Sequence, residues 1–281
     1  MYGNLPISID LRITGKCNLN CEYCFGAANT KEELDFFSWC NLLDKFYEYN
    51  VRCLIFTGGE PTTRKDLLEL LKYANKKGFF IVLSSNGLNK RLINYCEWID
   101  VLSLPLDGSN YEHCKLMRNM TQEEYMQVME NMRLFKKVYP NKKLKIGTVV
   151  TQRNISNIEK IYYVIQEIAD IWKLYQVSEH LKNTLIYKTE LEVSDAMFSN
   201  IEKHIQNKFA NRIKICFYRN SDRNGKYLFC EPNADAMVIL NNSELVIGNF
   251  LNNFDIIMKN WQGFVKENLL EDNILDTYYF A

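Results

Sequence analysis

The sequence has no excess of charge of either sign. Its 281 residues include 34 lysine and arginine residues and 34 aspartate and glutamate residues, which gives a formal net charge of +0. A protein that binds nucleic acid through a broad basic surface carries an excess of positive charge. We therefore expect no nucleic-acid partner of that kind, although a small basic pocket is compatible with a neutral total.

Long apolar runs are missing as well. No run approaches the roughly 20 apolar residues that span a bilayer. The N-terminal stretch, MYGNLPISID, lacks the basic start and long apolar segment of a secretory signal. We expect a cytoplasmic protein with no membrane partner. The chain also lacks repeats, low-complexity tracts and linkers rich in proline and glycine, and its length fits one large α/β domain with or without an appendage.

Short apolar runs alternate with longer amphipathic segments over most of the chain, and they predict strands and helices respectively. Strands are expected at 7–13, 52–58, 79–85, 100–106, 143–150 and 172–177, and helices at 34–49, 64–78, 89–98, 121–138 and 156–171. The helix at 121–138 opens with the capping-box pattern of Thr121 and Glu124. This order predicts right-handed βαβ units and a parallel sheet. Six units are too few for a closed eight-stranded barrel, so the expected fold is α/β, as a partial barrel or an open doubly wound sheet.

The pattern changes after about residue 185. Helices are expected at 194–209 and 254–269. Between them, short apolar runs separated by turns predict antiparallel hairpins, with strands at 212–218, 226–230, 235–240 and 244–248. We therefore divide the chain into a core, 1–185, and a small α+β extension, 186–281.

Nine cysteines are more than packing usually requires, and in the cytoplasm they are not expected to form disulfides. Six of them are scattered among apolar or mixed neighbours and are interpreted as small buried hydrophobic residues: Cys40, Cys53, Cys96, Cys114, Cys216 and Cys230. The other three, Cys17, Cys21 and Cys24, are clustered in the stretch CNLNCEYCF.

Three thiolates in one short loop can hold a metal centre on one side. Structural zinc sites use four ligands, usually as two separated pairs. No nearby residue supplies a fourth, because His113 is far along the chain and Cys40 lies in a predicted helix. An iron–sulfur cube held by three cysteines leaves one iron without a protein ligand, and an open metal position lets a small molecule coordinate and react.

The spacing Cys17-x-x-x-Cys21-x-x-Cys24, with Tyr23 just before the last cysteine, resembles the signature of radical S-adenosylmethionine (SAM) enzymes. Stretches similar to further motifs of that family follow in order: TGGEP (57–61), SSNG (84–87), LPLDGS (104–109) and KIGTVVTQRNISNIEKI (145–161). The resemblance covers roughly residues 5 to 180. It implies a partial (β/α)6 radical SAM barrel.

The resemblance also implies the chemistry. Three cysteines would hold a [4Fe-4S] cluster, and SAM would chelate the unique iron through its amino and carboxylate groups. One electron, from a donor such as flavodoxin or ferredoxin, would cleave SAM into methionine and a 5′-deoxyadenosyl radical that abstracts hydrogen from a substrate. The protein's share of this work is positioning and the exclusion of water and oxygen.

A set of SAM-binding residues follows from the resemblance. Tyr23 would contact adenine, and the small Gly58 and Gly59 would let the backbone approach the methionine end. Glu60 would bind the methionine ammonium, and Arg118 would bind the carboxylate by bidentate bonds. Polar side chains at strand ends would reach the ribose or the carboxylate: Ser85, Asn86 and Ser103, the last of which is alternatively a packed hydroxyl.

The stretch YLFCEPNADAMVILNNSELVIGNFLNNFDIIMKNW (227–261) resembles the shortened SPASM extension, or twitch domain, of many radical SAM enzymes. Ala234 stands where that motif has glycine, and the cysteines of a full SPASM domain are missing. Cys216 and Cys230 alone are too few for a second cluster, which takes four ligands. We expect a single cluster.

KIGTVV followed by WKLYQ is similar to the corresponding stretches of viperin and its prokaryotic relatives, which act on nucleoside triphosphates. Lys145 and Lys173 fall where that family places phosphate-binding lysines, although Gly147 stands where an asparagine is expected. Two lysines at one barrel mouth favour an anionic substrate. The alternative is that both lie at strand edges and face solvent.

Three functions are therefore open. The first is a radical SAM enzyme that acts on a small, phosphorylated or nucleotide-like molecule, and the second is one that modifies a peptide, as twitch-type enzymes do. The third is a non-catalytic metal-binding protein. The intact GGEP and SSNG motifs argue against the third, because a structural metal site needs no SAM pocket. The absence of an obvious N-terminal peptide-recognition domain favours the first.

Overall fold

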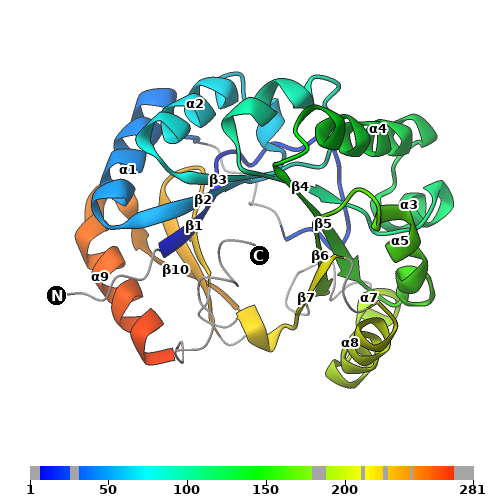
Figure 1. The fold of residues 1–281 in the computed structure, drawn as a ribbon. Helices are drawn as coiled ribbons and strands as arrows, with labels where there is room; N and C mark the ends of the chain where they lie inside the picture. Colours follow the sequence, from blue (N-terminus) through cyan, green and yellow to red (C-terminus); the bar gives the residue numbers. More distant parts are fainter. Residues whose placement is uncertain are drawn as a thin grey trace.

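The computed structural model describes residues 7–25, 32–178, 188–209, 213–223, 227–240 and 243–268. In this part of the chain ten strands form one sheet in the order β10-β9-β8-β1-β2-β3-β4-β5-β6-β7. The sheet curves into a partial barrel, and the helices lie along its outer side (Figure 1). The two edge strands, β10 and β7, are not paired with each other, so the barrel is open.

The strands are β1 (Ile7–Arg12), β2 (Val51–Thr57), β3 (Phe80–Ser84), β4 (Val101–Pro105), β5 (Lys143–Val150), β6 (Ile171–Gln176), β7 (Lys214–Tyr218), β8 (Leu228–Cys230), β9 (Asp235–Leu240) and β10 (Ser243–Asn249). The helices are α1 (Phe36–Glu48), α2 (Leu67–Lys77), α3 (Tyr111–Arg118), α4 (Gln122–Val138), α5 (Ile158–Ile165), α7 (Lys188–Leu191), α8 (Asp195–Phe209) and α9 (Phe250–Asn268), with 3-10 turns at Pro61–Thr63, Leu92–Trp98, Ile155–Asn157 and Ser221–Arg223. None of these helices is both long and apolar enough to cross a membrane.

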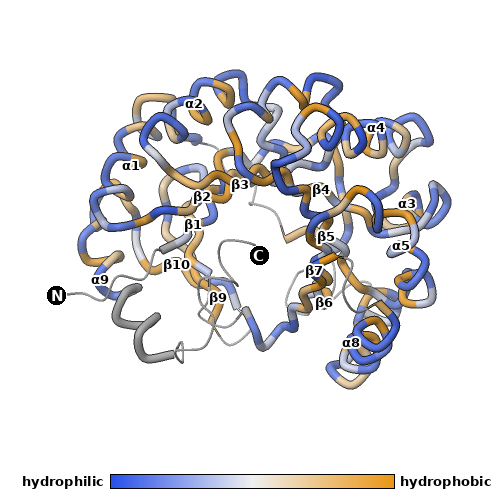
Figure 2. Tube along the Cα trace, viewed as in Figure 1, coloured by the Kyte–Doolittle hydropathy of each residue, from blue (hydrophilic) through white to orange (hydrophobic). Residues whose placement is uncertain are grey.

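Alternate residues of each parallel strand face opposite sides of the sheet. In β1 and β2, for example, Ile9, Leu11, Leu54 and Phe56 join the large apolar core together with residues of the outer helices. The residues between them face the barrel interior, where Cys53 packs against neighbours from β3 and β4 in a smaller apolar cluster. Apolar residues accordingly concentrate along the strands, with hydrophilic residues frequent on the outer helices (Figure 2).

The predicted parallel sheet is confirmed, and so are the six strands of the first part of the chain. Thr121 and Glu124 form the predicted capping box of α4. Helix α2 ends as predicted at Gly78, whose φ of 89° lies in the left-handed region that glycine adopts without strain. The helix expected at 89–98 is instead the 3-10 turn Leu92–Trp98.

The strand predicted at 212–218 does not form a hairpin, so this part of the hairpin prediction is wrong. Residues 214–218 form β7, which pairs in parallel with β6 and continues the barrel. The reason is that helix α8 precedes β7 and serves as a crossover connection, so that β6, α8 and β7 form one more βαβ unit. The other hairpin predictions are confirmed, since β8, β9 and β10 pair in antiparallel order.

The strands of the predicted extension lengthen the sheet of the core at both edges. Strand β8 pairs in parallel with β1, through Asp10 with Phe229 and Leu11 with Cys230. The tight turn between β8 and β9 places Ala234 at φ 69°, fully buried. Glycine, which the twitch motif has at this position, adopts that conformation with less strain, and the resemblance to a twitch domain stays a prediction. The boundary drawn at residue 185 stays a prediction, and it falls among residues outside the described part.

Candidate active site

The carboxyl ends of β1, β2, β3 and β4 meet at one rim of the barrel, the usual place for a site in a parallel sheet. The loop after β1, here called the cysteine loop (14–25), carries the three clustered cysteines. The GGE stretch follows β2, and the serine and asparagine of SSNG follow β3. The fold therefore brings the predicted motifs together at one end of the barrel.

Within the cysteine loop, Cys17 and Cys24 are exposed and Cys21 is half-buried. The Cys24 N–H donates to the Cys21 carbonyl at 3.2 Å, which closes a turn between the second and third thiols. Burial raises the pKa of Cys21 to about 11, against the lowering effect of the Arg118 charge. A bound metal centre would keep the three thiols deprotonated.

A single metal ion and a cluster demand different arrangements of the same thiols. No group of three or more histidine, cysteine, aspartate or glutamate side chains in the described residues converges on one metal ion. In an iron–sulfur cube each thiolate binds a different iron, so the sulfurs need not meet at one point. Three thiolates from one loop can hold three irons of such a cube and leave the fourth iron open.

The GGE stretch packs against the start of the cysteine loop. The Gly59 N–H donates to the Thr14 carbonyl, and the Glu60 N–H donates to the Lys16 carbonyl, both at 2.7 Å. A Cβ atom on Gly58 would lie 2.4 Å from the Thr14 oxygen, and one on Gly59 would lie 2.2 Å from the Lys16 oxygen. The glycines are thus required for contact between two loops, while their predicted approach to SAM stays a prediction.

Gly59→Ala is expected to displace the cysteine loop, because the new methyl group would overlap the Lys16 backbone carbonyl. A backbone carbonyl cannot rotate out of the way as the end of a flexible side chain can. The variant should bind less than half of the wild-type iron after anaerobic reconstitution. Gly147→Ala is the matched control, since its Cβ would meet only the Tyr175 ring at 3.4 Å. Equal iron content in Gly59→Ala and the wild type would contradict the packing role.

Glu60 joins the ends of β2 and β3. Its carboxylate is buried, and one oxygen accepts hydrogen bonds from the Thr62 N–H, the Thr62 hydroxyl and the Ser85 hydroxyl at 2.6–3.0 Å. The other oxygen accepts from the Asn86 N–H at 2.6 Å. Burial raises the pKa of Glu60. Three predicted SAM-binding residues therefore form one hydrogen-bonded unit, in which Glu60 fixes the positions of Ser85 and Asn86.

Two further contacts complete this rim. The Asn86 side chain donates to the Asn18 side chain in the cysteine loop at 2.7 Å. Ser103 lies in β4 beside Ser84 and Lys145, and its carbonyl accepts from the Ser85 N–H at 3.1 Å. The side chain of Ser103 is half-buried, and its predicted contact with SAM stays a prediction.

Asp107 is a residue of this site that the sequence reasoning missed. It is fully buried, and its carboxylate accepts from the Tyr23 hydroxyl at 2.6 Å, from Arg118 Nε at 2.5 Å and from the Val149 N–H at 2.7 Å. Arg118 also points Nη1 toward Cys21 Sγ, 4.0 Å away. The signal was an aspartate directly after a buried strand, within LPLDGS.

Asp107 restricts the groups with which Arg118 and Tyr23 can bind SAM. The Arg118 guanidinium is ion-paired through Nε, so a SAM carboxylate would have to bind the two terminal nitrogens. Tyr23 is held by its hydroxyl, and its ring packs with Met117, Val177 and Leu191 in a small apolar cluster. Such a cluster suits the predicted contact with adenine, which stays a prediction.

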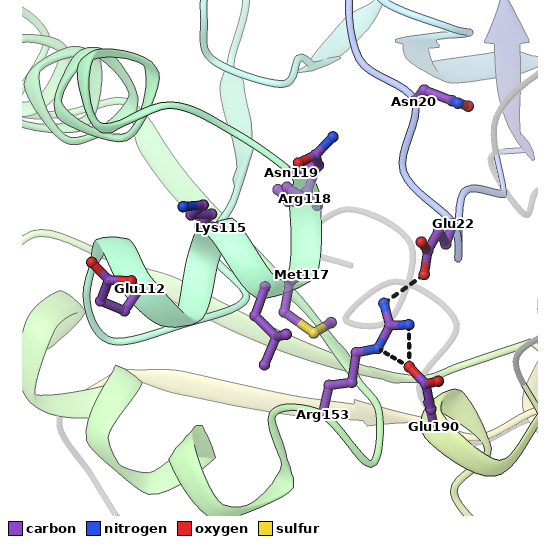
Figure 3. A pocket seen from close by; sticks show the side chains of 10 residues that line it. Asn20, Glu22, Glu112, Lys115, Met117, Arg118, Asn119, Arg153 and Glu190 are labelled. Carbon is purple, nitrogen blue, oxygen red and sulfur yellow. Dashed lines mark hydrogen bonds and ion pairs between the residues drawn. The ribbon is translucent and has the colours of Figure 1, made fainter.

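A pocket of about 740 Å³ opens beside the cysteine loop (Figure 3). Its wall includes Arg153, which forms ion pairs with Glu22 of the cysteine loop and Glu190 of α7. The pocket is lined by Asn20, Glu22, Glu112, Lys115, Leu116, Met117, Arg118, Asn119, Arg153 and Glu190. The cysteine loop is therefore tied to α7 on its outer side and to Asp107 on its inner side.

Lys145 and Lys173 lie inside the barrel. Their neighbours in β5 and β6 join the outer core, so the two lysines face the other way, and their exposed fractions are 4% and 3%. The expectation of solvent-facing lysines is wrong. They also lie deeper than the mouth, since Lys145 is the third of the eight residues of β5.

Asp10 of β1 faces the same interior as the two lysines, because its neighbours Ile9 and Leu11 join the outer core. Burial raises the pKa of Asp10 to about 6, and the positive charges of Lys145 and Lys173 oppose that rise. Lys173 Nζ also lies 3.5 Å from the centroid of the Tyr218 ring, a cation–π contact. The part of the barrel interior that holds Asp10, Lys145 and Lys173, here called the lysine region, therefore carries charged groups beneath the rim, beside the apolar cluster of Cys53.

An open barrel of parallel strands with three cysteines after its first strand defines a class of metalloenzyme, and comparison with known proteins identifies it. The sequence profile of the Radical SAM superfamily matches residues 11–162. The chain therefore belongs to the radical SAM superfamily and is a radical SAM enzyme. Its cofactors are those of the family, a [4Fe-4S] cluster and SAM.

Two relatives share one named activity. The chain is 25% identical over 241 residues to an S-adenosylmethionine-dependent nucleotide dehydratase of Flammeovirga pacifica, covering 82% of this chain and 81% of that one. It is 28% identical over 215 residues to a second such enzyme from Selenomonas ruminantium, covering 72% and 77%. These likenesses are to nucleotide dehydratases, and they cover most of each chain.

The fold has solved counterparts. Streptococcus suis SuiB bound to the precursor peptide SuiA matches with a TM-score of 0.69 and 16% identity, over 98% of this chain and 65% of that one. At this level of identity the likeness concerns the fold alone. It confirms the predicted partial radical SAM barrel.

Proposed function

We propose that this enzyme holds its cluster through Cys17, Cys21 and Cys24, and that it acts on a small anionic molecule, phosphorylated or nucleotide-like. When bound, the cluster supplies the electron that cleaves SAM into methionine and a 5′-deoxyadenosyl radical, which abstracts hydrogen from the substrate. The observation that carries the substrate class is the pair of buried lysines inside the barrel. The likeness to two nucleotide dehydratases supports it.

The residues of the rim have separate tasks in this proposal. Glu60, with Ser85 and Asn86 fixed by its hydrogen bonds, faces the methionine end of SAM. Asp107 orients Arg118 toward the SAM carboxylate and Tyr23 toward the adenine. The backbone at Gly58 and Gly59 holds the cysteine loop against β2, so that all of these groups keep a fixed position relative to the thiolates.

The lysine region below the rim suits an anion for electrostatic reasons. Burial lowers the pKa of Lys145, and the negative charge of Asp10 opposes that fall. When both lysines are protonated, two ammonium groups and one carboxylate leave a net positive charge, whose field is stronger in low-dielectric surroundings. A phosphate group would also replace part of the hydration that a buried ammonium loses. We propose Lys145 and Lys173 as the substrate-binding residues. The cytoplasm, where thiols stay reduced, is the proposed compartment, with a flavodoxin or ferredoxin as electron donor.

Peptide modification is the second candidate, because the fold matches SuiB bound to a precursor peptide and the C-terminal strands resemble a twitch extension.

Anaerobically reconstituted and reduced enzyme with SAM alone should release 5′-deoxyadenosine slowly. Addition of a nucleoside triphosphate should accelerate that release at least about tenfold, as substrate binding completes the site. No acceleration by any nucleotide, together with rapid turnover of a peptide, would replace the first candidate with the second.

A further inference from the structure

Arg12, the last residue of β1, connects three parts of the chain. Its side chain is 4% exposed, and Nη1 donates to Glu231 Oε1 at 2.7 Å. Nη2 donates to the Phe25 carbonyl at 3.0 Å. The guanidinium also lies over two rings, 4.3 Å from the centroid of Phe229 and 5.1 Å from that of Phe25. Arg12 therefore contacts the residue directly after Cys24 and the residue directly after β8.

These contacts complete the attachment of the cysteine loop. The start of the loop is fixed by hydrogen bonds from Gly59 and Glu60. Its middle is fixed by Tyr23, which donates to Asp107. Its end has the Arg12 bond to the Phe25 carbonyl, and that guanidinium is in turn fixed by Glu231, 219 positions along the chain.

We infer that Arg12 and Glu231 are positioning residues for the cluster, which hold the end of the cysteine loop and therefore Cys24 in place. This inference rests on the proposed ligation of the cluster by the three cysteines. Glu231 lies outside the part of the chain, 11–162, that matches the family. The C-terminal strands therefore contribute to the cluster site itself, in addition to any part in substrate binding.

Glu231 can hold the end of the loop in place because it fixes the orientation of the buried Arg12 guanidinium. Arginine presents several donors in a rigid plane, so a carboxylate on one side fixes the direction of the other N–H groups. Without the Glu231 charge, the buried guanidinium would turn toward Glu244, which is 3.8 Å from Nη2 and 40% exposed. That turn would weaken the bond to the Phe25 carbonyl.

Glu231→Gln tests the inference, because it removes the charge and keeps the shape. The reconstituted variant should release iron to a ferrous chelator about tenfold faster than the wild type, as loss of a charge-assisted hydrogen bond predicts. The electron paramagnetic resonance signal of its reduced cluster should also broaden or shift. Glu244→Gln is the matched control and should behave as the wild type, since its contact with Arg12 is longer and more exposed.

Phe229→Leu separates positioning from stability. It removes the ring under the guanidinium and leaves both hydrogen bonds of Arg12 in place, so it should lower the melting temperature with a smaller effect on iron release. Wild-type iron release and resonance signal in Glu231→Gln, whatever its melting temperature, would overturn the inference. The proposed ligation fails separately, if Cys24→Ala keeps its full iron content.

Discussion

Alanine at any one of Cys17, Cys21 and Cys24 is expected to remove most of the bound iron and to stop SAM cleavage. The three thiols come from one loop that is fixed at its start, middle and end, so no other cysteine can move in to replace a lost ligand. Among the described residues, the cysteines outside the loop lie in strands and helices. With two ligands left, a cube would expose a second iron and break down.

Iron and sulfide analysis after anaerobic reconstitution checks this result. The wild type should contain about four irons and four sulfides per chain, and each of the three variants should contain less than about one of each. Cys230→Ala is the control, because Cys230 is fully buried in β8 among apolar residues of the core. About eight irons in the wild type, or stoichiometric zinc after anaerobic purification, would contradict a single cluster.

The features that the sequence revealed are those that depend on near neighbours. The spacing of the three cysteines lies within one loop, and the alternation of apolar runs with amphipathic segments identifies β1 to β6 one unit at a time. The capping box of Thr121 and Glu124 is likewise four residues long. Such signals survive in the sequence because the contacts that produce them are local.

The features that could not be predicted from the sequence depend on residues far apart along the chain. The strand at 214–218 looks the same whether it pairs with β6 or with a hairpin neighbour, and only the packing of α8 decides between them. Asp107 acquires its role from Tyr23, 84 positions earlier, and Arg12 acquires its role from Glu231. An isolated lysine in a strand also gives no sign of burial, because its environment comes from the opposite wall of the barrel.

The double substitution Lys145→Met with Lys173→Met is expected to remove the acceleration of SAM cleavage by nucleoside triphosphates and to leave the slow, uncoupled cleavage nearly intact. Both side chains lie below the rim where the thiolates, Glu60 and Arg118 gather, so the change removes contacts to one ligand without disturbing the other. Two charge-assisted contacts correspond to a loss of roughly 100-fold in nucleotide affinity.

The fold should tolerate this change because of Asp10. Its pKa is already raised to about 6 by burial, and the two lysine charges restrain that rise. With methionine at both positions the pKa of Asp10 should rise further, so the carboxyl becomes neutral near pH 7 instead of remaining as an unpaired buried charge. The single substitution Asp10→Asn should act in the opposite direction and tighten nucleotide binding, because it removes negative charge from the lysine region.

Lys143→Met with Lys214→Met is the matched control. It removes the same formal charge from β5 and β7, but both side chains are exposed. Rates of 5′-deoxyadenosine release with and without nucleotide would be measured for the wild type and both double variants. The proposal requires that only the Lys145 and Lys173 pair loses nucleotide acceleration, at an unchanged basal rate. If acceleration persists in that variant, the anion is bound elsewhere, and the two buried lysines serve the barrel through their contacts with Asp10 and Tyr218.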